Sequence, residues 1–181
     1  WSSDVCSSDL SVETDDPRAK LSIFLGALCG LRRGEVRGLL WDDVDQIGQV
    51  IHVRHNYIDA DGLKSPKNGI ARDVPMPSMV KEAFDQVRAV SPWRSKNDYV
   101  IFHVEKRNVP VGETFLQNRL ESMLEGIGIP NKVRIERNIT FHSLRHSFVT
   151  LGRLSGLSDF VIQALAVHKS SAMMERYSHA A

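Results

Sequence analysis

Apolar residues recur every three or four positions along most of this 181-residue chain, which is the spacing of an α-helix with one buried face. The first such segment follows Asp16 and Pro17, a pair that favours a helix start, and we expect it to end at Gly30. Residues 49–58 break the pattern because their apolar and polar residues alternate. The chain is therefore constrained to a mainly helical fold that includes a small β-sheet.

The alternating segment has the pattern of a half-buried strand. Its two faces are Ile51, Val53 and Tyr57 on one side and His52, Arg54 and Asn56 on the other. Turn-forming residues follow at 59–62 and at Asn68-Gly69, so we expect two further strands that end near Val74. The three strands predict one small antiparallel sheet.

The remaining patterned segments are helical, apart from residues 99–102, which we expect to be extended. The predicted helices are residues 33–40, a helix capped by Ser78, residues 113–127, 140–155 and 158–166, and a short helix that reaches Tyr177. The fold class is α+β, a mainly helical domain with a small antiparallel sheet. We assign residues 15–181 to this domain and expect residues 1–14 to be disordered or a non-native leader.

Charge is unevenly distributed along the chain. The formal net charge is +1, but residues 1–16 hold five carboxylates and no Lys or Arg, so residues 17–181 carry +6. A mildly basic domain is compatible with a nucleic-acid partner. The longest apolar run, residues 23–31, is too short to span a bilayer, and two cysteines do not indicate a disulfide framework. We therefore expect a cytoplasmic protein that does not contact a membrane.

Four polar segments stand out from these patterns. Residues 30–35, Gly-Leu-Arg-Arg-Gly-Glu, place an arginine in the turn between two helices. Residues 142–146, His-Ser-Leu-Arg-His, put two histidines and an arginine on one helix face, beside an apolar stripe that faces the core. The others are His168 and, nine residues later, Tyr177. Taken singly, each is compatible with a solvated helix face, a helix-end ion pair or a packing residue.

Together these segments resemble the tyrosine recombinase (phage integrase) family, in its C-terminal catalytic domain. The resemblance runs from about residue 15 to 179: an arginine in a G-L-R-x-x-E turn, a lysine on a β-hairpin, H-x-L-R-H, a late histidine, and a tyrosine nine residues on. It implies the catalytic residues Arg32, Lys67, His142, Arg145, His168 and Tyr177. Lys67 fits the hairpin lysine best because it directly precedes the Asn68-Gly69 turn, and Lys64 is the alternative.

The resemblance implies that DNA is cut and rejoined through a covalent 3′-phosphotyrosine. Tyr177 would attack a phosphodiester, with nearby positive charge favouring its phenolate. Arg32 and Arg145 would hold the charge that develops on the phosphate oxygens, with His168 as a third donor.

The remaining site residues would move protons or hold the arginines in place. His142 would assist proton removal or position the phosphate, and Lys67 would protonate the 5′-oxygen leaving group. Glu35 would orient the Arg32 turn or favour a helix N-terminus. The phosphotyrosine conserves the energy of the broken bond, so we expect no cofactor and no metal. The implied partners are double-stranded DNA and, in the full-length protein, further copies of the chain, as a tetramer on DNA.

Three departures from the family pattern affect these expectations. Val167 stands where the family usually has glycine, which bears on how closely His168 approaches the phosphate. The N-terminal DNA-clamping domain of most members is absent from this sequence, which also stops four residues after Tyr177. We therefore expect a fragment of a longer enzyme.

Two other functions share part of the pattern. A type IB topoisomerase-like enzyme uses the same tyrosine chemistry, but the H-x-L-R-H arrangement favours a recombinase. A non-catalytic helix-turn-helix remnant could be built around Gly156, but it leaves Arg32, Lys67 and Tyr177 unexplained.

Two acidic clusters favour turns over metal sites. Asp42, Asp43 and Asp45 have no partner carboxylate that stands out elsewhere, so we predict a polar turn that leads into the first strand. Residues 59–62 lack the later ligands of a calcium loop and predict a turn as well.

Overall fold

The computed structural model describes residues 16–66 and 70–166. The helices are α1 (Pro17–Ala27), α2 (Arg33–Gly38), the 3₁₀ turn η1 (Trp41–Asp43), α3 (Ser78–Val90), α4 (Glu113–Gly126), α5 (Asn131–Glu136), α6 (Phe141–Leu154) and α7 (Asp159–Ala166). The strands are β1 (Val44–Asp45), β2 (Val50–Val53), β3 (Asn56–Ile58), β4 (Gly62–Lys64) and β5 (Arg72–Pro75). The predicted α+β class is confirmed. Within the described ranges, no helix is long and apolar enough to cross a membrane.

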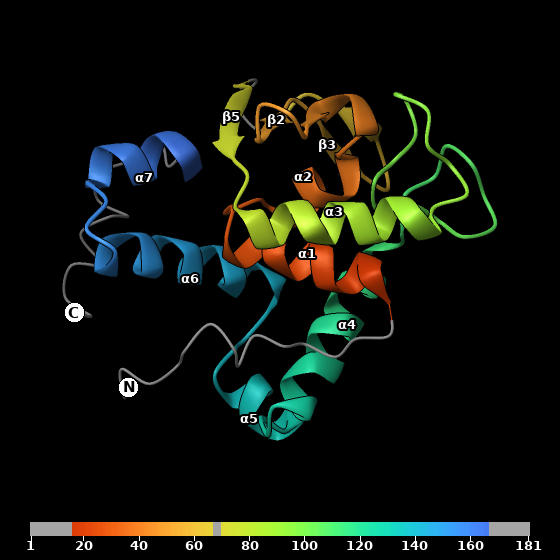
Figure 1. The fold of residues 1–181 in the computed structure, drawn as a ribbon. Helices are drawn as coiled ribbons and strands as arrows, with labels where there is room; N and C mark the ends of the chain where they lie inside the picture. Colours follow the sequence, from red (N-terminus) through yellow and green to blue (C-terminus); the bar gives the residue numbers. More distant parts are fainter. Residues whose placement is uncertain (1–15, 67–69, 167–181) are drawn as a thin grey trace.

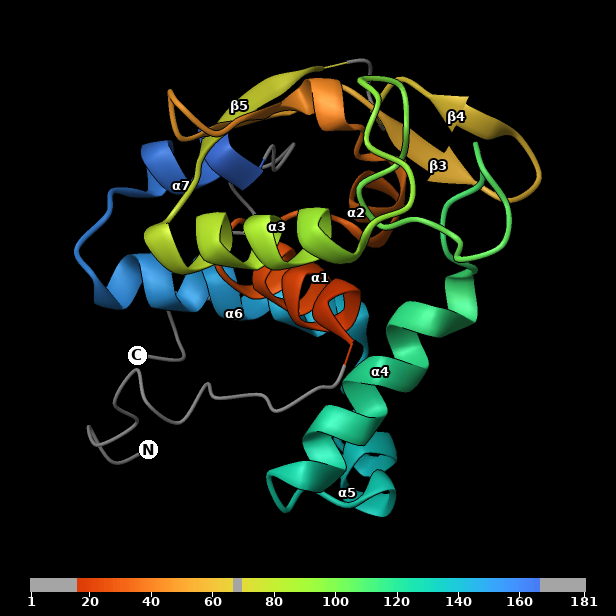
Figure 2. The ribbon, with the colours of Figure 1, turned by 45° about the vertical axis from the view of Figure 1, so that its right-hand side comes forward.

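Helix α1 lies at the centre of the molecule (Figure 1). Helices α3 and α6 pack along it, and α4 contacts it as well. Helix α2 and the strands lie on one side of this layer, whereas α5 packs on α4 at the opposite side (Figure 2). Helix α7 bridges two parts of the fold because it packs on both α6 and β5.

The main core joins α1 to its neighbours through buried apolar side chains. Its largest buried members include Leu21 and Leu25 of α1, Phe84 of α3 and Leu116 and Leu120 of α4. A smaller cluster lies between α6 and α7 and consists of Phe148, Val149, Ile162 and Ala166, with Leu165 packed against it. The two clusters place α6 between the core and the last described helix.

Helix α1 begins where its sequence predicts and ends at Ala27, three residues before the predicted end at Gly30. The Asp16 side chain accepts a hydrogen bond from the Arg18 N–H at 3.0 Å, which caps the helix ahead of Pro17. The chain leaves the helix at Leu28 and turns sharply at Gly30, whose φ is +65°. Only glycine adopts this backbone conformation without strain.

The strand predicted at residues 49–58 is two strands in separate sheets. Strand β2 lies between β1 and β5 in a three-stranded antiparallel sheet, whereas β3 pairs with β4 in a two-stranded one. The break falls at Arg54 and His55, which both turn to the buried carboxylate of Asp43, each at 2.8 Å. Successive side chains of a regular strand point to opposite faces, so two adjacent residues cannot reach one carboxylate without a bend.

The one sheet predicted for this region is therefore two sheets, and the predicted turn at Asn68-Gly69 lies outside the described residues. The turns predicted at residues 59–62 and around Asp45 are confirmed. Residues 59–62 form the turn between β3 and β4, with Ile58 paired to Gly62. Asp45 accepts backbone hydrogen bonds from Ile47 and Gly48, as a polar turn requires. Asp43 also accepts the backbone N–H of Leu40. Helix α5 was not predicted from the sequence.

Candidate active site

The turn after α1 places Arg32 against helix α6. Gly30 lies so close to this helix that a Cβ atom on it would meet the Phe148 ring at 2.6 Å. Its carbonyl oxygen accepts a hydrogen bond from Nη1 of Arg145, also on α6. Arg32 follows two residues later as the N-cap of α2. The conformation at Gly30 therefore brings the two predicted catalytic arginines to one place.

A buried carboxylate, Glu35, organises this turn. It accepts the backbone N–H of Arg32 and the Arg32 side chain, both at 2.8 Å, so it caps α2 and orients the arginine at once. Arg72 of β5 approaches the same carboxylate with both terminal nitrogens, at 3.0 and 2.7 Å. Burial alone would raise the pKa of Glu35, but hydrogen bonds and charge from Arg72 and Arg32 hold it below its ordinary value.

Arg145 is almost completely buried, with 2% of its surface exposed. Beyond the bond from Nη1 to Gly30, its Nη2 atom finds no hydrogen-bond acceptor within residues 16–66 and 70–166. Burial, together with the positive charges of Arg32 and Arg72, lowers the pKa of Arg145 to about 9, while Glu35 opposes that shift. The surroundings thus disfavour its positive charge, and an anion at this place would relieve the penalty.

His142 and His146 lie one helical turn apart on α6, with their rings edge to face and 4.9 Å between centroids. Partial burial and the positive charges of His146, Arg145, Arg32 and Arg33 lower the pKa of His142. Partial burial and Arg145 lower the pKa of His146 as well. A neutral His142 at neutral pH has a ring nitrogen that can accept a proton.

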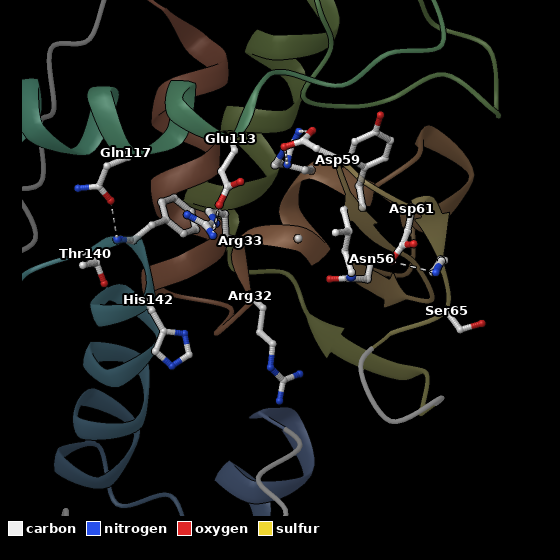
Figure 3. A pocket seen from close by; sticks show the side chains of 16 residues that line it. Arg32, Arg33, Asn56, Asp59, Asp61, Ser65, Glu113, Gln117, Thr140 and His142 are labelled. Carbon is white, nitrogen blue, oxygen red and sulfur yellow. Dashed lines mark hydrogen bonds and ion pairs between the residues drawn. The ribbon is translucent and has the colours of Figure 1, made fainter.

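An open groove of about 900 Å³ runs past these residues. Arg32 and His142 extend toward the same space from α2 and α6, with Arg33 above them in an ion pair with Glu113 of α4 (Figure 3). Strands β3 and β4 supply the opposite wall, including Asn56 and Lys64. The residues that line the groove are Arg32, Arg33, Gly34, Arg37, Asn56, Tyr57, Ile58, Asp59, Asp61, Lys64, Ser65, Glu113, Gln117, Thr140, Phe141 and His142.

Three of the six predicted catalytic residues are brought together. Arg32, His142 and Arg145 come from two elements and act on each other electrostatically. The other three, Lys67, His168 and Tyr177, lie outside the described residues. The alternative lysine, Lys64, lines the groove at the end of β4 and forms an ion pair with Asp61 at 3.0 Å. No group of His, Cys, Asp and Glu in the described part of the chain has the arrangement of a metal site.

Arg72 is a residue of this site that the sequence patterns did not reveal. In the β2–β5 pairing, Ile51 lies opposite Val74 and Val53 opposite Arg72. Because Ile51, Val53 and Val74 are buried, Arg72 occupies the inward-facing register of the sheet. A charged residue at a core-facing position two residues before a buried valine is the signal that could have identified it.

The sequence profile of the phage integrase family matches residues 5–181. The chain belongs to the phage integrase family. This assignment agrees with the resemblance carried by the G-L-R-x-x-E turn and the H-x-L-R-H helix.

Curated members of the phage integrase family align with nearly all of this chain. The tyrosine recombinase XerD of Corynebacterium glutamicum is 28% identical over 175 residues, which cover 95% of this chain and 51% of XerD. The tyrosine recombinase XerC of Agrobacterium fabrum is 29% identical over 161 residues, 88% of this chain and 44% of XerC. The chain thus spans about half the length of the curated relatives it matches.

Solved structures of a transposon integrase and of a recombinase have the same fold. The Tn1549 transposon integrase, determined in complex with circular intermediate DNA, aligns with a TM-score of 0.72 at 22% identity, over 94% of this chain and 59% of that one. The XerA recombinase also aligns with a TM-score of 0.72 at 22% identity, over 94% of this chain and 56% of its own. At this identity the likeness establishes the fold.

Proposed function

We propose that this chain is the catalytic domain of a site-specific DNA recombinase that cleaves and rejoins DNA strands through a 3′-phosphotyrosine. The observation that carries the proposal is the Nη2 atom of Arg145, buried and without an acceptor among the described residues. A buried donor left unpaired costs about 1–3 kcal/mol, and more when it is charged. A phosphate oxygen at this place would supply the missing acceptor.

The charge around Arg145 fits a phosphodiester under attack. Arg32, Arg72 and Arg145 carry three positive charges around the single carboxylate of Glu35. An attacked phosphodiester gains negative charge on its nonbridging oxygens, and fixed guanidinium donors stabilise that charge without reorganising. Removal of one such donor typically slows a reaction by about 100- to 1000-fold.

The proposed reaction conserves bonds and protons at each step. The hydroxyl oxygen of Tyr177 bonds to phosphorus while the bond from phosphorus to O5′ breaks. The tyrosine proton passes to a base, for which His142 is the candidate, and Lys67 gives a proton to O5′. In rejoining, a 5′-hydroxyl attacks the phosphotyrosine and the same protons return. His168 is the proposed third donor to the phosphate.

The same proposal includes double-stranded DNA as partner and a tetramer of full-length chains on DNA as the working assembly. We expect the enzyme to be located with its DNA substrate, which in a bacterial cell lies in the cytoplasm. The curated relatives are recombinases and transposases, which does not favour topoisomerase-like relaxation or a non-catalytic DNA-binding remnant.

The test is capture of a covalent adduct from a pool of DNA duplexes of many sequences. The full-length protein carrying this sequence is incubated with duplexes that have a randomised centre and a nick, so that the short 5′-hydroxyl product diffuses away. Adducts that survive boiling in detergent are isolated and their DNA is sequenced. We expect enrichment of one sequence and a mass shift on the peptide that contains Tyr177.

A matched pair of variants identifies the nucleophile. Tyr177→Phe should abolish the adduct, since it removes one hydroxyl and keeps the ring. Tyr57→Phe makes the same change on a tyrosine that lines the groove, and it should leave the adduct. Adduct formation by Tyr177→Phe excludes Tyr177 as nucleophile, and relaxation of supercoiled DNA without strand exchange would favour the topoisomerase alternative.

A further inference from the structure

Arg72 connects three elements that are distant in sequence. Its side chain is 6% exposed and contacts the Glu35 carboxylate with both terminal nitrogens. Its Nε atom donates to the carbonyl oxygen of Leu165, at 2.6 Å, in the last turn of α7. Arg72 therefore links β5 to the start of α2 and to the end of α7.

The contact with Glu35 reaches Arg32 through a shared carboxylate. Glu35 has two oxygens, and Arg72 and Arg32 both donate to them. The carboxylate is therefore held from the sheet by Arg72 and from the turn by Arg32, so the two arginines form one hydrogen-bonded network. Arg72 is not among the residues that line the groove, and its influence on a bound phosphate would pass through Glu35 and Arg32.

The contact with Leu165 reaches the last described turn of α7. Nε of Arg72 donates a hydrogen bond from a charged group to the Leu165 carbonyl oxygen, and such bonds are stronger than those between neutral groups. The same guanidinium thus joins the Glu35 carboxylate to α7.

We infer that Arg72 is a positioning residue for Arg32. Arg72 holds both the Arg32 turn and the last described turn of α7 against strand β5. The inference rests on the proposed function for its effect on DNA cleavage. A purely stabilising ion pair is the competing explanation, although buried pairs can often be replaced by apolar residues of similar size without loss of stability.

Arg18 provides a matched control, because it is a partly buried arginine whose three side-chain nitrogens all have partners. It contacts the Asp16 carboxylate through Nε and Nη2 at 3.0 and 2.8 Å, and it donates from Nη1 to the carbonyl oxygen of Phe102 at 2.8 Å. Like Arg72, Arg18 thus pairs with one carboxylate and one backbone carbonyl, and it is not among the residues that line the groove. Arg18→Met therefore removes the same interactions without touching the Arg32 turn.

The first measurement is the rate of adduct formation at saturating DNA, together with DNA affinity. Arg72→Met should slow the rate at least tenfold in the wild-type background, with affinity changed less than about twofold, and Arg72→Lys should recover part of the rate. In an Arg32→Lys background, Arg72→Met should slow adduct formation by less than about twofold, because the effect of Arg72 is transmitted through Arg32, which is already impaired. Equal losses in both backgrounds would overturn the inference.

The second measurement does not depend on activity. Hydrogen exchange followed by mass spectrometry should show faster exchange in α2 and α7 of Arg72→Met, and unchanged exchange in α4. Arg18→Met should leave α2 and α7 unchanged and speed exchange at the start of α1. If the wild-type protein forms no adduct, the proposed function fails, and the exchange pattern alone tests whether Arg72 positions the Arg32 turn and α7. Unchanged exchange rates in α2 and α7 of Arg72→Met would refute this inference.

Discussion

The two ends of helix α1 use arginine in opposite ways. At the N-terminal end, Arg18 lies against the rings of Phe102 and Phe115 and pairs with both Asp16 and a backbone carbonyl. At the C-terminal end, Arg145 of α6 is more deeply buried, yet its Nη2 has no acceptor in the described part of the chain. The donors of Arg18 at the N-terminal end are paired within the protein, whereas Nη2 of Arg145 at the C-terminal end could still donate to a ligand.

This difference is the basis for the proposal that Arg145 binds the phosphate, whereas Arg18 stabilises the fold. Buried polar groups in folded proteins are nearly always paired, so an unpaired charged donor calls for a particular explanation. Residues at binding sites violate such packing rules because the ligand completes them. The comparison therefore predicts that changes at the N-terminal end reduce stability, and that changes at the C-terminal end reduce phosphate binding and cleavage.

The largest expected effect separates the two ends by activity. Arg145→Lys keeps a charge but loses the planar pair of donors, so the adduct rate should fall about 100-fold or more, with some cleavage left. Its free energy of unfolding should change by less than about 1 kcal/mol, because a poorly paired buried charge contributes little to stability. Single-turnover adduct formation and urea unfolding measure the two quantities.

Arg18→Lys is the mirror of this variant. It disrupts a fully paired arginine, so it should cost about 1–2 kcal/mol of unfolding free energy. Its adduct rate at a temperature where the protein is folded should stay within about twofold of wild type. A substantial loss of adduct rate in Arg18→Lys would contradict this difference between the two ends. So would a loss of stability without a loss of adduct rate in Arg145→Lys.

The second prediction concerns the turn that builds the C-terminal end. Gly30→Ala combines a φ of +65° with a Cβ contact of 2.6 Å to the Phe148 ring. The backbone strain and the overpacking together should cost about 2–4 kcal/mol. Gly156→Ala has a φ of +79° and open space around its Cβ, so it should cost only the strain, about 1–2 kcal/mol. Equal losses in urea unfolding would show that the contact with Phe148 is unimportant.

Local patterns predicted the elements that depend on neighbours in sequence. The cap at Asp16, the turn at Gly30 and the helix that carries Arg145 all follow from residues within a few positions of one another. The break between β2 and β3 could not be predicted in this way. It depends on Asp43, which lies 11 and 12 residues from the two side chains that it binds.

The site shows the same limit. The G-L-R-x-x-E and H-x-L-R-H motifs pointed to Arg32 and Arg145 as candidates. The face predicted for Arg145 was polar, but the structure buries this residue beside the turn at Gly30. Arg72 escaped prediction because its partners Glu35 and Leu165 lie 37 and 93 residues away. The contacts of Arg72 form only when α2, β5 and α7 come together in the folded protein.

A third prediction tests the unpaired donor without DNA. Inorganic phosphate should stabilise wild-type protein beyond its general salt effect, by about 1 kcal/mol when its concentration is several times its Kd. Arg145→Met should lose this increment, whereas Arg18→Met should keep it. Thermal unfolding in phosphate and in chloride of equal ionic strength gives the difference. The same increment in Arg145→Met would place the anion elsewhere.

The smallest expected effect is a difference in acid sensitivity between the two ends. At the N-terminal end, burial would raise the pKa of Asp16, but Arg18 and Arg119 hold it below 3.8. The stability that this carboxylate contributes is therefore present above pH 3.8 and lost only as the pH falls further. At the C-terminal end, the lowered pKa values of His142 and His146 mean that the unfolded state binds more protons below 6.5.

Stability should accordingly fall as the pH drops from about 7.5 to about 5, and this loss should come from the C-terminal end, since the window lies above the range of Asp16. Replacing both His142 and His146 with Gln removes the two groups and should flatten the decline in unfolding free energy. Arg18→Met should lower the whole curve and leave its slope in this window unchanged. Urea unfolding at four pH values across the window measures these slopes. If the histidine variant keeps the wild-type slope, the two rings are not held neutral by their burial and by the arginines beside them, and His142 loses its basis as the proton acceptor.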